Sequence, residues 1–184
     1  MFGASWESVL GACRVGAEWA WRQVYEELAP TLLRYHRARG ASEAEDLVGD
    51  TFVRVVRGLP SFEGTEEQFR AWVFQISRRR AIDLGRSARR RPEDPAPPEQ
   101  LAERGWIGDA EDDAIRSIEE ERVRTILGGL TEDQRDVLVL RLLADLTVDQ
   151  VATVIGRSPG AVKALQGRGL ERVRREISRG AVTF

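Results

Sequence analysis

Apolar residues recur along most of the chain at helical spacing, without the alternation typical of strands. The i, i+3, i+4, i+7 spacing that places side chains on one face of a helix is clearest at Phe69, Trp72, Val73 and Ile76. The same spacing predicts helices over residues 6–15, 18–39, 43–58, 66–90, 113–128, 132–144, 148–155 and 159–178. We therefore expect an all-α protein.

Capping signals mark the starts of several of these helices. In a capping box, a Ser or Thr and a Glu or Gln three residues later satisfy backbone amides that a helix start leaves unpaired. Four such pairs precede apolar periodic stretches: Ser42 and Glu45, Thr65 and Gln68, Thr131 and Gln134, and Thr147 and Gln150. Ser158 followed by Pro159 marks a fifth start, with serine as the cap and proline at the first helical position.

The formal net charge of −2 conceals strongly segregated charges. Residues 68–91 contain eight Arg and one acidic residue, and residues 157–179 contain seven Lys or Arg and two acidic residues. The proline-rich stretch that follows the first block opens residues 92–121, which carry eleven Asp or Glu and two Arg. This pattern predicts two small helical domains, residues 1–91 and 119–184, joined by a flexible acidic linker over residues 92–118. Each basic block is expected to contact a polyanion.

The second basic block contains the sharpest local motif. A short amphipathic helix, a tight turn at residues 156–158 and a long basic helix from Pro159 have the spacing of a helix-turn-helix. The core stripe of the last helix is predicted to hold Val162, Leu165, Gly169, Val173 and Ile177, and its outward side Gly160, Lys163, Ala164, Gly167, Arg168, Glu171, Arg174 and Arg175. Small residues near the helix start allow close approach to a DNA groove, where Lys163 and Arg168 can reach phosphates or base edges. The alternative is a helical hairpin with a solvated basic face.

The helix predicted over residues 66–90 carries its positive charge opposite its apolar face. That side holds Gln75, Arg78, Arg79, Ile82, Arg86 and Arg89. Such a row suits a track for nucleic-acid phosphates, and the alternative is that the arginines are simply solvated. Trp72 could stack on an unpaired base, but its place in the apolar stripe favours core packing.

Cys13 and His36 are the only cysteine and the only histidine, which excludes an intrachain disulfide and a Cys/His zinc site. We expect Cys13 to be a small buried hydrophobe and His36 a partly exposed helical residue. The N-terminal residues do not resemble an export signal, and no apolar run approaches the roughly 20 residues that a membrane span needs. The chain is therefore expected in the cytoplasm, without membrane insertion.

The helix predicted after Ser42 differs from the basic ones. Its acidic residues, Glu45, Asp46 and Asp50, share the helix with Leu47, Val48, Phe52, Val53 and Val56. Acidic groups near a helix start suit the helix dipole. An acidic and apolar helix beside a DNA-binding one also suggests a surface for docking a protein.

Taken together, these segments resemble the extracytoplasmic-function sigma factors of bacterial RNA polymerase over nearly the whole chain. Residues 25–35 (YEELAPTLLRY) are similar to the first helix of sigma domain 2, residues 44–52 (AEDLVGDTF) to region 2.2, and residues 69–76 with 81–83 (FRAWVFQI, AID) to regions 2.3 and 2.4. Residues 130–135 (LTEDQR) are similar to the start of domain 4, and residues 158–166 (SPGAVKALQ) to its promoter-reading helix. The order and spacing of these segments strengthen the resemblance.

The resemblance implies a role for each segment. The acidic helix would dock on the clamp helices of core RNA polymerase, through Asp46, Leu47, Asp50 and Phe52. Domain 2 would melt and hold the −10 element, through Ser61, Phe62, Trp72, Arg78, Arg79 and Arg86. Domain 4 would contact the polymerase flap and read the −35 element, through Ser158, Gly160, Ala161, Lys163, Ala164 and Arg168. An anti-sigma factor is a further expected partner.

The sequence departs from the family pattern at four of these positions. Gly49 stands where the family often has Gln, and Arg79 where it often has Asn. Gly167 and Gly169 replace bulkier residues in the recognition helix, each costing roughly 1 kcal/mol of helix propensity. These departures predict weak affinity for DNA or polymerase alone.

One function from another class remains as an alternative. A stand-alone helix-turn-helix regulator would bind duplex DNA without polymerase, but would have no need of the acidic helix around Asp46. The sequence does not favour a nucleic-acid-processing enzyme, because it contains no metal-ligand cluster, no Gly-rich phosphate loop and no nucleophile with its base. We therefore expect no catalytic residue, metal, cofactor or small-molecule substrate.

Overall fold

A computed structural model describes residues 6–90, 123 and 125–181. These residues form helices and connecting turns, and no strand occurs among them, so the all-α prediction is confirmed. The first half contains α1 (Trp6–Arg14), α2 (Glu18–Ala38), α3 (Ala44–Gly58), the short 3-10 helix η1 (Leu59–Ser61) and α4 (Glu66–Arg90). The second half contains α6 (Glu132–Leu142), α7 (Val148–Ile155) and α8 (Pro159–Ala181). The helix expected over residues 113–128 and the acidic linker lie largely outside the described residues, although residues 125–128 are helical.

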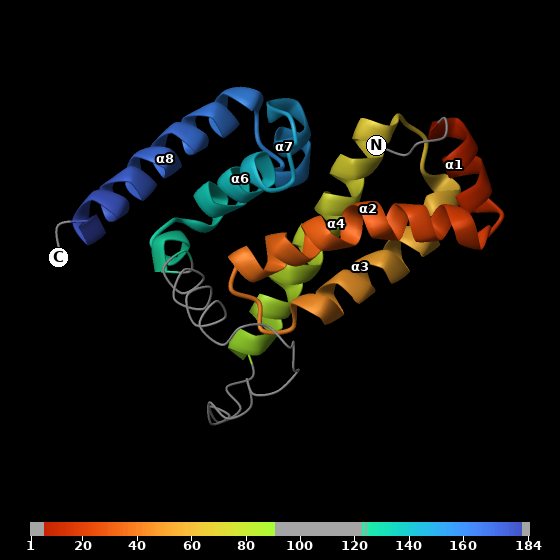
Figure 1. Cartoon of the computed structure of the whole chain (residues 1–184), viewed down its shortest axis with the longest axis horizontal. Helices are drawn as coiled ribbons and strands as arrows, with labels where there is room; N and C mark the ends of the chain where they lie inside the picture. Colours follow the sequence, from red (N-terminus) through yellow and green to blue (C-terminus); the bar gives the residue numbers. More distant parts are fainter. Residues whose placement is uncertain (1–5, 91–122, 124, 182–184) are drawn as a thin grey trace, which may run out of the picture.

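The N-terminal helices form one bundle around aromatic and aliphatic side chains. In Figure 1, α2 and α3 lie side by side, α4 crosses them, and α1 closes one end. Fully buried residues come from each helix: Val9, Val24, Leu28, Leu32, Tyr35, Val55, Val73 and Phe74. The apolar stripe predicted on α4 is confirmed, with Phe69 and Val73 buried and Trp72 and Ile76 half-buried.

Three of the predicted capping boxes form, and the one at Ser42 is wrong. Thr65, Thr131 and Thr147 each accept the amide of the glutamine three residues later, and that glutamine accepts the amide of the threonine. The helix α3 instead begins at Ala44, without a side-chain cap on Glu43. The Glu45 carboxylate pairs with Arg37 of α2 at 2.7 Å and does not cap the amide of Ser42. The cap at Ser158 is confirmed, since its Oγ accepts the amide of Ala161 at 3.2 Å.

The C-terminal helices pack closely because α8 carries a glycine where it meets α6. A Cβ atom at Gly169 would lie 3.1 Å from Leu138 Cδ1, so the glycine that weakens the helix also allows this contact. Val162 and Gly169 are buried and Leu165 and Val173 half-buried, as the predicted stripe requires. Ile177 is 49 % exposed, which contradicts its predicted core position. The reason is length, since α8 has 23 residues and α6 only 11, so the end of α8 extends past its partner.

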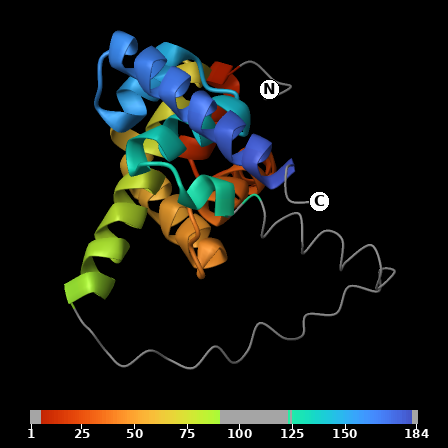
Figure 2. The same ribbon diagram turned by 90° about the vertical axis from the view of Figure 1, so that its left-hand side faces the viewer.

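The two halves are not separate bodies, because α7 packs on α4 and α6 on α2. Figure 2 shows the C-terminal helices lying against the N-terminal bundle, while the last turns of α4 project away from both. Polar side chains also join the halves through backbone carbonyls. Gln75 donates to Thr153 O at 3.3 Å, Gln150 to Glu67 O at 3.1 Å, and Arg70 to Ala144 O at 3.3 Å.

Cys13 and His36 both lie inside the N-terminal bundle. Cys13 is buried as predicted, and burial raises the pKa of its thiol to about 11. His36 was expected to be partly exposed, and this is wrong, since its side chain is fully buried. Its Nε2 atom lies 2.6 Å from Ser77 Oγ of α4, so the packing of α4 over α2 removes it from solvent.

Candidate nucleic-acid and protein interfaces

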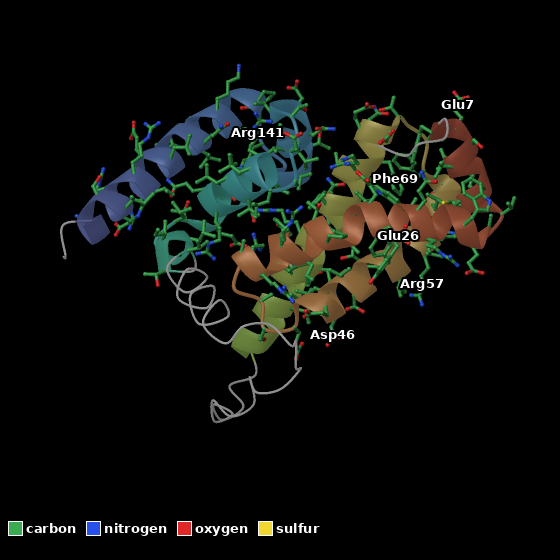
Figure 3. The ribbon with its side chains drawn as sticks, in the orientation of Figure 1. Glu7, Glu26, Asp46, Arg57, Phe69 and Arg141 are labelled. Atoms are coloured by element: carbon green, nitrogen blue, oxygen red, sulfur yellow. The ribbon has the colours of Figure 1, made fainter. Side chains whose placement is uncertain are left out.

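The helix α3 is two-sided, and its open side differs from the one expected. Leu47 and Phe52 are only 4 % and 8 % exposed, so both belong to the core. Asp46 is exposed, and the outward side adds the apolar Val53 and Val56, each about half exposed. Figure 3 shows Asp46 near the start of α3 and Arg57 near its end.

Asp50 also has a structural role. Its carboxylate forms an ion pair with Arg80 of α4 at 2.7 Å, with the Asp50 side chain 47 % exposed. This pair ties α3 to α4 and neutralises one arginine of the basic helix. Nearby, the half-exposed Tyr25 of α2 packs its ring 4.8 Å from that of Phe52, which extends the apolar surface beside α3.

The segment between α3 and α4 is shaped by an aromatic cluster. Phe62 lies 5.0 Å from Trp72 and 5.4 Å from Phe69, measured between ring centroids. Trp72 also packs over Gly58, where a Cβ atom would lie 2.9 Å from the indole. Trp72 is therefore held in the packing that its place in the apolar stripe predicted.

The helix α1 supports this segment, which the sequence did not reveal. Trp6 Nε1 donates to Gly64 O at 2.8 Å, and Arg14 Nη2 donates to Phe62 O at 2.5 Å. Ser61 is exposed, and its hydroxyl donates to Gly58 O at 2.9 Å. No local pattern marks the contacts of Trp6 and Arg14, because these join residues 58 and 48 positions apart.

The arginines of α4 point in different directions. Arg79 is exposed, as expected of a residue that meets DNA. Arg78 instead faces α6, where its Nε donates to Asp136 Oδ2 at 2.7 Å and its Nη2 lies 3.4 Å from Asp133 Oδ1. Arg86 lies on α4, but its side chain is outside the described part. Of the residues expected at the −10 element, Phe62 and Trp72 thus lie in an aromatic cluster, Arg78 lies in a charged contact between the domains, and Ser61 and Arg79 are exposed.

Asp136 is the centre of that contact. Its carboxylate is fully buried, accepts a hydrogen bond from Tyr35 Oη at 3.1 Å and pairs with Arg39 as well as Arg78. Arg39 also pairs with Glu132 at 2.7 Å. Burial raises the pKa of Tyr35 to about 12, so its hydroxyl stays a donor. Sequence offered one signal for this residue: a carboxylate placed three and four positions before the buried Val139 and Leu140.

The residues predicted for −35 recognition lie together at the start of α8. Ser158, Gly160, Lys163, Ala164 and Arg168 are exposed, and Ala161 is half-buried. The turn before them depends on Gly156, whose φ of 67° lies in the left-handed region that glycine adopts without strain. Arg157 is held at 2.9 Å from Asp133, which fixes the turn against α6. The open face of α8 can therefore approach a groove without moving the core.

Comparison with known proteins agrees with this arrangement. Residues 24–91 match the family described as Sigma-70 region 2, and residues 126–175 match Sigma-70, region 4. The ECF RNA polymerase sigma factor ShbA of Streptomyces griseus is 36 % identical over 79 % of this chain and 81 % of its own length. The ECF sigma factor SigD of Mycobacterium tuberculosis is 32 % identical over 96 % of this chain and 86 % of its own.

A solved structure is also similar. It is that of CnrH in complex with the cytosolic domain of CnrY, with a TM-score of 0.71, 25 % identity, and coverage of 93 % of this chain and 96 % of CnrH. Among the described residues, no helix is long and apolar enough to cross a membrane. The chain therefore belongs to the extracytoplasmic-function sigma factors of the sigma-70 family, and it is an alternative sigma factor that directs transcription initiation with RNA polymerase.

Proposed function

We propose that this sigma factor works through three surfaces on its two domains. They are the open side of α3, the segment before α4 together with Arg78, Arg79 and Arg86 of α4, and the start of α8. The observation that carries this proposal is that one small protein presents an acidic, apolar face and a basic recognition helix on different domains. A stand-alone regulator would need only the second.

The open side of α3 is proposed to dock on the clamp helices of core polymerase. Asp46 supplies charge there, and the half-exposed Val53 and Val56 supply apolar area. We assign Leu47 and Phe52 to holding α3 in place, because both side chains are buried. Asp50 acts from the edge through its pair with Arg80.

Domain 2 is proposed to hold the melted −10 strand between the segment from Ser61 to Phe62 and the row of Arg78, Arg79 and Arg86. Trp72 would support Phe62 from inside the domain, since the two rings are in contact. When the logarithm of the binding constant is plotted against the logarithm of the salt concentration, each arginine that contacts a phosphate of the single strand should make the slope steeper by about 0.7.

Domain 4 is proposed to read the −35 element with α8. Ser158 and the helix N-terminus would fix the register on a phosphate, while Lys163 and Arg168 reach phosphates or base edges. Gly160, Ala161 and Ala164 allow the helix to lie close to the groove. The same domain would contact the polymerase flap.

The remaining parts follow from these roles. We propose domain limits at residues 1–91 and 119–184 with an acidic linker over residues 92–118, and an anti-sigma factor as a regulatory partner, as CnrH has been solved with the cytosolic domain of CnrY. The protein would act in the cytoplasm, where polymerase and chromosome are, without a catalytic reaction, cofactor or small-molecule substrate of its own.

Run-off transcription with the host's core polymerase and a selected promoter tests the proposal. The wild type should give a specific transcript. Val53→Asp should lose the core complex, since it buries a charge at the docking face. Lys163→Ala with Arg168→Ala should keep the core complex and lose the transcript.

A matched control is Arg22→Ala, which removes an exposed charge outside the three proposed surfaces; within the described part of the chain, Arg22 pairs with Glu18 of its own helix. It should transcribe like the wild type. If the wild type binds promoter duplex tightly by itself and forms no core complex, the protein is a stand-alone regulator instead.

A further inference from the structure

The contact between the two domains uses a group that promoter DNA would also use. We define the carboxylate lock as Asp133 and Asp136 of α6 with Tyr35 and Arg39 of α2 and Arg78 of α4. Both oxygens of Asp136 are engaged, one by Tyr35 and Arg39 and the other by Arg78. A carboxylate in this position meets Arg78 as a phosphate would.

The central charge of the lock is out of solvent, so the loss of any one of its partners is costly. Asp136 is fully buried, and the Arg39 and Arg78 side chains are only 11 % and 15 % exposed. Two largely buried positive charges face one buried negative charge, and Asp133 and Glu132 at the edge supply further negative charge. Removing one partner of such a group leaves an uncompensated buried charge, which is strongly destabilising.

The locked arrangement is incompatible with binding both promoter elements. The −10 and −35 elements lie about 25 base pairs apart, which is roughly 85 Å at about 3.4 Å per base pair. In the locked form α7 of domain 4 rests directly on α4 of domain 2, with Gln75 bonded to Thr153. The domains must therefore separate before both can reach DNA.

We propose that Asp136, assisted by Asp133, replaces a promoter phosphate and holds the free sigma factor in a closed form that withholds Arg78 from DNA. Opening breaks the lock, exposes Arg78 on α4 and frees α7 from α4. The proposal rests on the promoter-binding roles given above. In the closed form, α6 and α7 therefore occupy the side of α4 that is proposed to bind the −10 element.

The test measures the distance between the domains in the full chain. Glu26→Cys on α2 and Arg175→Cys on α8 carry spin labels, because both positions are exposed and neither belongs to the lock. Cys13 is buried with its thiol pKa raised to about 11, so it should stay unlabelled. Pulsed electron spin resonance then reports closed and open populations.

Asp136→Asn is compared with Asp145→Asn, which removes the same charge from an exposed position outside the lock. The wild type and Asp145→Asn should show one short distance, and Asp136→Asn should shift at least half the molecules to longer distances. Arg39→Gln removes a partner of Asp136 on the N-terminal domain and should also shift the molecules to longer distances. This variant replaces Asp136→Asn in the test if circular dichroism shows that Asp136→Asn does not fold. Unchanged distances in the folded variants would overturn the lock.

Binding of a fluorescent single-stranded oligonucleotide tests whether Arg78 is withheld. Asp136→Asn should bind at least fivefold more tightly than Asp145→Asn, and adding Arg78→Ala should abolish that gain. An open protein without this gain would overturn the phosphate-replacement claim. If the distances behave as expected but no variant supports run-off transcription, the promoter-binding roles fail while the lock stands.

Discussion

Two buried polar residues of this protein lie where helices from distant parts of the chain meet. Asp136 joins α6 to α2 and α4, and His36 joins α2 to α4 through Ser77. Each is surrounded by partners that its own helix does not supply. Their charge states are therefore properties of the assembled fold.

His36 should make stability depend on pH below neutrality. Burial, with a smaller effect of the positive Arg39, lowers the pKa of His36 to about 4. At pH values between about 6.5, the pKa of an unfolded histidine, and the folded value, His36 is protonated in the unfolded chain but neutral in the folded protein. The free energy of unfolding should therefore fall by about 2 kcal/mol from pH 7 to pH 5, and this loss should level off below pH 4.

Chemical denaturation at several pH values measures this slope. His36→Gln removes the titrating group and keeps a polar side chain near Ser77, so its slope between pH 7 and pH 5 should be shallower. The wild type and His36→Gln carry the same carboxylates, so the effect of carboxylate titration cancels when their slopes are compared. Identical slopes would contradict the buried neutral histidine.

At the scale of single elements, the helices show which local signals decided their limits. The boxes at Thr65, Thr131 and Thr147 form, and Gln150 keeps its box although its amide nitrogen also donates to Glu67 O of α4. At Ser42, the pair between Glu45 and Arg37 replaces the box. A tertiary ion pair therefore moves the start of α3.

A pair of cap substitutions measures this difference. Thr131→Ala should lower the free energy of unfolding by about 1 kcal/mol, because it leaves the amide of Gln134 without its acceptor. Ser42→Ala should change it by less than about 0.5 kcal/mol, since Ser42 is exposed and caps nothing. Denaturant titrations of both variants give the values, and a larger loss at Ser42 would restore the sequence prediction.

Two glycines of α3 should respond in opposite ways to alanine. At Gly49 no atom lies within 4 Å of an added Cβ, so Gly49→Ala should stabilise the helix by up to about 1 kcal/mol. At Gly58 the added Cβ would lie 2.9 Å from the indole of Trp72, which Phe62 and Phe69 hold in place. Gly58→Ala should therefore cost about 1–3 kcal/mol.

Far-UV circular dichroism during denaturation compares the two glycine variants. The near-UV spectrum should also change for Gly58→Ala, because the Trp72 ring has to move, and stay the same for Gly49→Ala. Equal stability of Gly58→Ala and the wild type would show that Trp72 can shift freely.

At the scale of the whole molecule, the C-terminal helices cover part of the basic face of α4. Arg78 of that face is turned toward Asp136, Arg79 is exposed, and the last turns of α4 project away from both halves (Figure 2). If α4 and α8 bind the two promoter elements as proposed, this contact has to break. We therefore expect the free protein and the transcribing protein to differ in domain arrangement.

Tying the domains together should block transcription reversibly. Gln75→Cys and Thr153→Cys lie on either side of a hydrogen bond between the domains, and a bis-maleimide with an internal disulfide can join them. Run-off transcription should be lost on cross-linking and return on reduction of the linker. Each single-cysteine variant, treated in the same way, should stay active. Full activity of the joined protein would mean that the domains need not separate.

The sequence alone determined the helices, the helix-turn-helix and the family. These follow from apolar spacing, capping residues and short motifs, which act over a few residues and need no partner. The recognition helix was located for the same reason, since all its predicted contact residues lie within residues 158–168.

Only the tertiary structure decided which side chains depart from the pattern that helical spacing predicts. It buried Leu47, Phe52 and His36, exposed Ile177, and turned Arg78 from DNA toward Asp136. These outcomes depend on pairs as distant in sequence as Arg78 and Asp136, whose burial is tolerated because each group supplies charge and hydrogen bonding to the other. Local spacing carries no information about such pairs, so the closed arrangement of the two domains came from the fold.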